Sequence, residues 1–129
     1  MKSSIAKFIL ACPLLLSIGC SFYARDPDAY RDVTRELVDS RSTDVKECYD
    51  VALQTNDGVG GLVVVNFMVE KKTGRIMSPK VDETASTAPA ELGQCVVSAI
   101  DGLQLDPPDA RDGMATMSWD FSAAPPVQG

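Results

Sequence analysis

Two cysteines, Cys48 and Cys95, are the side chains whose type and placement carry the most chemistry in this sequence. Cys48 stands in DVKECYDVAL and Cys95 in ELGQCVVSAI, each on the apolar stripe of a predicted helix. The chain has no histidine and no C-x-x-C pair, whereas a zinc site needs about four ligands. We therefore predict no metal site and no cofactor, and we interpret the pair as a structural disulfide between buried helix faces. A redox-active pair is the alternative.

The first 19 residues have the pattern of a bacterial export signal. Lys2 and Lys7 precede an apolar run that ends at Ile18. As a helix this run would reach about 16 Å, whereas a bilayer core is about 30 Å thick. The run is too short to span a membrane, so we interpret residues 1–19 as a signal peptide.

Cys20 is the candidate for lipid attachment, because Gly19 before Cys20 resembles the end of the lipobox of bacterial lipoproteins. Ser17 stands where that motif usually has Leu, and Ser17 with Gly19 also fits ordinary signal peptidase. We favour lipidation, with palmitate among the acyl chains, because the alternative exports an unpaired thiol into an oxidising compartment. Ser21 is not the Asp that retains lipoproteins at the inner membrane, so we expect the outer membrane, facing the periplasm.

Removal of the leader and lipidation of Cys20 would leave Cys48 and Cys95 as a lone pair in an exported domain. This count is the basis for predicting that they bond to each other.

Composition limits the remaining possibilities to one acidic globular domain. The 129 residues are 45% hydrophobic and 23% charged, with a net charge of −6. That charge argues against nucleic acid as a partner, because phosphates require a basic surface. We divide the chain into a signal peptide at 1–19, a tether and helix at 20–42, a domain at 43–122 and a disordered tail at 123–129.

Three segments show the apolar spacing of amphipathic helices. Asp26 and Pro27 fit the cap and first turn of a helix that ends before SRST. A second helix is predicted to begin at Asp44, which forms a capping-box-like pair with Glu47. A third covers residues 90–103, AELGQCVVSAIDGL.

Three other segments have strand patterns. LVVVNFMVE alternates valines and Phe67 onto one face and is predicted to be the central strand. After a KKTG turn, RIMSPKV is predicted to be an edge strand, because Pro79 cannot donate to a ladder. Its apolar Ile76 and Val81 lie five positions apart, which hints at a bulge. ATMSWDF at 115–121 is the last predicted strand.

These elements predict an α+β fold, a two-layer sandwich. A helix that crosses from the second to the third strand gives a three-stranded antiparallel-type sheet of order 2-1-3, with helices on one face.

From Val45 to about Phe121 the chain resembles the AgmX/PglI C-terminal domain family, which is TonB C-terminal-like. The shared motifs are the CY helix, TGRI, the CVVSAI helix, the LDPP turn and an aromatic-ended strand, although Leu105 and SWDF depart from the family pattern. The resemblance implies a non-catalytic α/β sandwich of the bacterial cell envelope, with both cysteines at positions usually paired. The long spacer and inner-membrane span of a TonB energy transducer are missing from this sequence.

The binding mode that the resemblance implies is addition of a partner's extended segment to a free strand edge. We place this edge at the last strand, with outward Thr116, Ser118 and Asp120 as partner-binding candidates, and expect Met117, Trp119 and Phe121 to fill the core. The partner would be an envelope protein of unknown identity, and the lipid anchor would contact the membrane. A structural accessory lipoprotein, or a regulator of an envelope complex that binds without strand addition, is the alternative.

Two acidic pairs and one acidic triad are the candidates for enzyme or calcium chemistry. Asp106 with Asp109, or Asp82 with Glu83, could in principle serve as acid and base, and Asp106, Asp109 and Asp112 could loosely hold calcium. We interpret them as solvated loop residues, because no nucleophile lies beside a base and the spacing is not that of an EF-hand. No small-molecule substrate is evident. An exposed cavity with buried acids at its base would favour an enzyme.

Overall fold

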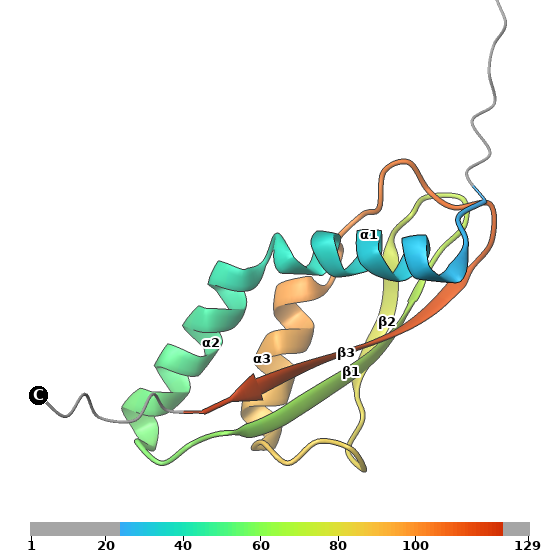
Figure 1. The fold of residues 1–129 in the computed structure, drawn as a ribbon. Helices are drawn as coiled ribbons and strands as arrows, with labels where there is room; N and C mark the ends of the chain where they lie inside the picture. The colour runs from blue at the N-terminus through green and yellow to red at the C-terminus, as the bar shows by residue number, and fades with distance from the viewer. Residues whose placement is uncertain (1–23, 123–129) are drawn as a thin grey trace, which may run out of the picture.

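The computed structural model describes residues 24–122, which form three helices and a three-stranded antiparallel sheet (Figure 1). In chain order the elements are α1 Pro27–Asp39, α2 Ser42–Thr55, β1 Gly61–Val69, β2 Ile76–Val81, α3 Ala90–Ile100 and β3 Gly113–Phe121. The sheet order is β2-β1-β3. The predicted α+β class and strand order are therefore confirmed. The leader, Cys20 and the 123–129 tail lie outside the described residues.

Helix α1 begins as its sequence predicts. The Asp26 carboxylate accepts a hydrogen bond from the Ala29 N–H at 2.8 Å, and proline occupies the first turn, where its missing N–H costs nothing. Towards the end of the helix, Val38 is 2% exposed and belongs to the same core cluster as the strands. Helix α1 thus packs against the domain.

The prediction that Asp44 caps helix α2 was wrong. The helix begins at Ser42, its N-cap residue is Arg41, and no side chain caps it. Asp44 lies in the first turn instead, where a carboxylate is favoured by the helix dipole, and it pairs with the Arg41 guanidinium at 3.6 Å.

The core lies against one face of β1. The β1 side chains that point into it are almost completely buried: Val63, Val65, Phe67 and Val69. Residues of all three helices join them in one hydrophobic cluster, including Val38, Cys48 and Val96. The alternation predicted from the sequence therefore marks the core face correctly.

The β1–β2 hairpin has the predicted turn and the predicted bulge. Gly74 has a φ of 70°, and a Cβ there would collide with the Leu105 carbonyl. The register shifts between Asn66 and Met68, and the extra residue falls in β2. Ser78 in this bulge has a φ of 51°, which is rare for a residue other than glycine.

The chain returns through α3 to the far side of β1 and forms β3. This strand pairs antiparallel with β1 over nine residue pairs, from Gly61 opposite Phe121 to Val69 opposite Gly113. It begins at Gly113, two residues earlier than the alternation from Ala115 predicted. Glycine is needed here, because a Cβ at 113 would collide with the Tyr30 ring of α1.

Candidate functional site: the open edge of the sheet

Strand β3 lies at one edge of the sheet. The strand order places β1 on one side of it, and within residues 24–122 no strand pairs on the other side. An edge strand of nine residues presents a row of backbone donors and acceptors that a further strand could pair with.

The register shows which β3 residues carry these outward groups. Val64 of β1 accepts a hydrogen bond from the Asp82 N–H at 2.8 Å, so even-numbered β1 residues direct their backbone groups towards the β2 side. Odd-numbered β1 residues therefore bond to odd-numbered β3 residues. The backbone N–H and C=O groups that point away from the sheet belong to the even-numbered residues of β3: Met114, Thr116, Ser118 and Asp120.

The side chains of the predicted partner-binding candidates are exposed. Thr116, Ser118 and Asp120 all lie on the sheet face opposite the core. The Thr116 hydroxyl donates to Asn66 Oδ1 at 2.6 Å, so this side chain is already engaged within the sheet. The core-facing neighbours behave as expected, since Met117 and Phe121 are buried and Trp119 packs against the core cluster.

The opposite edge, β2, is poorly suited to pair with another strand. Its bulge places Ser78 and Pro79 in the middle of the strand, where the proline has no N–H to donate and Ser78 departs from extended geometry. Pro79 predicted that the β2 edge is less able than the β3 edge to pair with another strand, and the geometry of the two edges agrees with this prediction.

A cavity of 480 Å³ lies beside the first half of β3. One wall is α1, which contributes Tyr30, Arg31 and Thr34, and the other is β3 from Gly113 to Met117. The segment before β3 closes one end with Asp109. The open edge is thus the floor of a groove between a helix and a strand.

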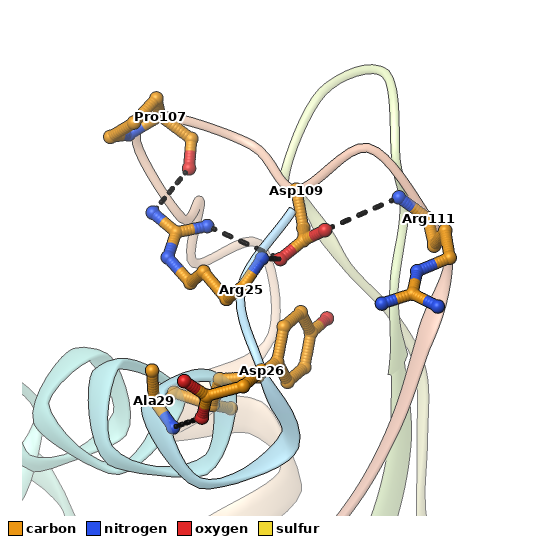
Figure 2. A network of polar contacts seen from close by, with 8 residues as sticks. Arg25, Asp26, Ala29, Pro107, Asp109 and Arg111 are labelled. Carbon is orange, nitrogen blue, oxygen red and sulfur yellow. Dashed lines mark hydrogen bonds and ion pairs between the residues drawn. The ribbon is translucent and has the colours of Figure 1, made fainter. Parts of the chain in front are cut away.

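The end of this groove is held by an ion pair between distant parts of the chain (Figure 2). The Arg25 guanidinium lies 3.7 Å from Asp109 Oδ2, and both side chains are largely buried, at 9% and 3% exposed. Asp109 also accepts hydrogen bonds from the backbone N–H groups of Arg25 and Arg111, and Arg25 Nη2 donates to the Pro107 carbonyl at 3.0 Å. The contacts attach the start of α1 to the 106–112 loop.

Tyr30 lies next to this ion pair. Its hydroxyl is buried, with no hydrogen-bond partner among the described residues. Burial raises the pKa of Tyr30 above its ordinary value, and the negative charges of Asp109 and Asp112 raise it further, partly offset by the Arg25 cation.

The expectation that Asp109 is a solvated loop residue was wrong. Its carboxylate is buried because Arg25 supplies a cation and two backbone N–H groups supply donors. Asp106 and Asp112 remain exposed, and Asp112 accepts from the Lys71 N–H. In the part of the chain that the structure describes, no three Cys, Asp or Glu side chains form a group suited to a metal ion.

The cavity beside Asp109 is the feature that could favour an enzyme. Its buried acid is engaged in the ion pair with Arg25 and in two backbone hydrogen bonds. The other acidic pair is also structural, since Asp82 accepts from the N–H groups of Thr84 and Ala85 and thereby forms a turn. The contacts of Asp109 and Asp82 therefore hold loops in place.

Cys48 and Cys95 form the predicted disulfide, which joins α2 to α3. The expectation that both cysteines lie on buried faces was wrong for one of them: Cys48 is 7% exposed, whereas Cys95 is an exposed residue. Hollows of about 460 Å³ lie on either side of the bond and share the half-exposed Val51. The bond therefore lies at the outer side of the helix pair.

Two features of the site were missed by sequence reasoning. Met114 extends the outward row, and continuing the alternation backwards from Thr116 would have found it. The α1 wall rests on Arg25 and Asp109, which are 84 positions apart, and no local pattern links them.

Comparisons of the chain with protein-family models, curated proteins and solved structures gave no match. The resemblance to the AgmX/PglI family consequently stays a prediction. Within residues 24–122 there is no helix with the length and apolar character needed to cross a membrane.

Proposed function

We propose that this protein is a non-catalytic, lipid-anchored binding or assembly module of the bacterial cell envelope, and that it holds an extended segment of a partner protein at the β3 edge. The observation that carries this proposal is the row of outward backbone groups from Met114 to Asp120. In strand addition, such groups provide affinity, and side chains on the two faces provide specificity.

The groove beside β3 supports the proposal. A segment added to β3 would run between that strand and α1, with Tyr30 and Arg31 along its outer side. The Arg25–Asp109 pair fixes the position of the helix, so the groove exists before a partner binds. A preformed site reduces the ordering cost of binding.

The membrane part of the proposal rests on the leader. The Gly19-Cys20 junction supports lipid attachment at Cys20, which stands shortly before the first described residues. The domain would then be tethered at the outer membrane and face the periplasm. A Cys20→Ser variant tests this step: it is expected to leave the membrane fraction, and a variant that stays membrane-bound would show that lipid is not the anchor.

Strand addition can be tested by removing one outward N–H. Ser118→Pro deletes a donor at the open edge but no ladder bond, because residue 118 does not bond to β1. Proline is tolerated at such edge positions, and it restricts the preceding Met117 to the extended conformation that it already has. Ser118→Ala is the matched control, since it removes the hydroxyl and keeps the N–H.

The assay is photo-crosslinking in cells, with a photoreactive residue at position 116 on the β3 edge or at position 80 on the β2 edge. We expect a partner adduct from position 116 that persists in Ser118→Ala and disappears in Ser118→Pro, and none from position 80. A urea unfolding curve confirms that each variant is folded. An adduct that survives Ser118→Pro unchanged would refute strand addition and favour an accessory lipoprotein or regulator that binds through another surface.

A further inference from the structure

Three of the five methionines of the chain fall into one row across the sheet. Met68 of β1 lies opposite Met77 of β2 on one side and opposite Met114 of β3 on the other. Residues directly opposite each other in neighbouring strands point to the same face of a sheet. The three thioethers therefore extend from one face.

This face is the one opposite the hydrophobic core. The adjacent row, Ile76 opposite Val69, is almost completely buried on the core side, so the methionine row must point the other way. Met114 is 77% exposed, Met68 and Met77 are partly exposed, and none of the three belongs to the core cluster or packs against it. Core packing therefore does not explain the row.

The spacing allows the three sulfur atoms to converge. Cβ atoms of directly opposite residues lie about 5 Å apart, and the two outer strands are about 10 Å apart with β1 between them. Met68 and Met114 form a pair without mutual backbone hydrogen bonds, in which side chains are closer. Each methionine has three rotatable side-chain bonds, so the outer sulfurs can turn towards Met68.

We propose that Met68, Met77 and Met114 form a thioether site for a soft monovalent metal ion, Cu(I) or its analogue Ag(I). Thioether sulfur is a neutral, soft ligand that selects Cu(I), whereas Zn²⁺ takes imidazole, thiolate or carboxylate, and Ca²⁺ and Mg²⁺ take oxygen. The chain has no histidine to compete for the ion. This site goes beyond the proposed strand addition: Met68 and Met77 lie away from the open edge, and Met114 is the one methionine of the three that also belongs to it.

The test titrates Ag(I) into the full chain in chloride-free buffer and follows the ¹³C-labelled ε-methyl groups of methionine by NMR. Cys12→Ser and Cys20→Ser are introduced first, because free thiols bind Ag(I) more tightly than thioethers. We expect the methyl signals of Met68, Met77 and Met114 to shift together and saturate at one ion per chain. The Met117 signal serves as an internal control on the core face and should not move.

Met68→Leu, Met77→Leu and Met114→Leu should each lower the Ag(I) affinity by about tenfold or more, which corresponds to about 1.4 kcal/mol. Met117→Leu is the matched control on the other face of β3 and should leave the affinity unchanged. Methionine and leucine have similar volumes, and an unfolding curve checks each variant. Three results would overturn the proposal: a shift confined to Met114, equal affinities for all four variants, or the same shifts with Zn²⁺.

Discussion

The disulfide should carry a large part of the stability of this domain. In the chain-entropy account, a cross-link stabilises a protein by reducing the freedom of its unfolded state, and the effect grows with the length of the closed loop. Cys48 and Cys95 are 47 positions apart. For a loop of this length the account gives about 4 kcal/mol at 25 °C. Small domains have total stabilities of about 5–15 kcal/mol.

The perturbation is the double variant Cys48→Ala and Cys95→Ala, compared with the parent in a Cys12→Ser and Cys20→Ser background. Urea unfolding followed by circular dichroism measures the free energy of unfolding and its dependence on urea concentration. We expect the free energy to fall by about 4 kcal/mol. The urea dependence should become steeper, because an unfolded chain without the cross-link exposes more surface.

Reduction of the parent with a thiol reagent provides the control for the alanine substitutions themselves. Cys48 is buried, so Cys48→Ala removes some packing, whereas the exposed Cys95 should tolerate alanine well. The reduced parent and the double variant should agree to within about 1 kcal/mol. If the double variant and the reduced parent each lose less than about 1 kcal/mol, the chain-entropy account is refuted for this domain. Such a result would show that contacts between the α2 and α3 segments persist in the unfolded chain and already restrict it.

Further predictions concern the two cysteine thiols, Tyr30 and Gly113. Each single alanine variant leaves one free thiol, Cys95 in Cys48→Ala and Cys48 in Cys95→Ala. The Cys95 thiol should react with a disulfide reagent at least about tenfold faster than the Cys48 thiol, because only Cys95 is exposed. Equal rates would contradict the assigned burial. Tyr30→Phe should raise the free energy of unfolding by about 1 kcal/mol, since it removes a buried hydroxyl without a partner. Because the folded-state pKa of Tyr30 is raised above its unfolded value of about 10, the parent should also lose stability as the pH rises through that folded pKa, and Tyr30→Phe should lose less. Gly113→Ala should lower the free energy of unfolding by about 1–3 kcal/mol, because the Cβ of the new alanine collides with the Tyr30 ring. The loss should be smaller in a Tyr30→Ala background, where the ring is absent. An equal loss in that background would contradict the collision as the cause.

Most of the fold follows from short-range patterns. The alternation that includes Phe67 identified the core face of β1, and the Asp26-Pro27 pair identified the start of α1. The proline and the five-residue spacing from Ile76 to Val81 correctly indicated an edge strand with a bulge. Each of these signals lies within a few residues, so no knowledge of the tertiary contacts was needed.

The parts that sequence reasoning missed depend on contacts between distant segments. Asp109 is buried only because Arg25, far away in the sequence, reaches it. The exposure of Cys95 depends on how far α3 is rotated about its own axis where it packs on α2. The apolar periodicity of α3 predicts that rotation only to within a fraction of a helical turn. The methionine row depends on two pairings: the β1–β2 turn sets Met68 opposite Met77, and the pairing of β1 with β3, a strand distant in the sequence, brings Met114 opposite Met68.

Strand β3 connects the two proposed sites. The backbone of Met114 belongs to the open edge, while its side chain belongs to the methionine row on the face opposite the core. A partner strand added beside β3 would place one of its own side chains next to Met114 on that same face. A methionine there would extend the row of thioethers, whereas a bulky apolar side chain would cover Met114 and hold it away from Met68. Occupation of the edge and occupation of the metal site should therefore influence each other through this single side chain, and the sign of that coupling depends on which residue the partner presents.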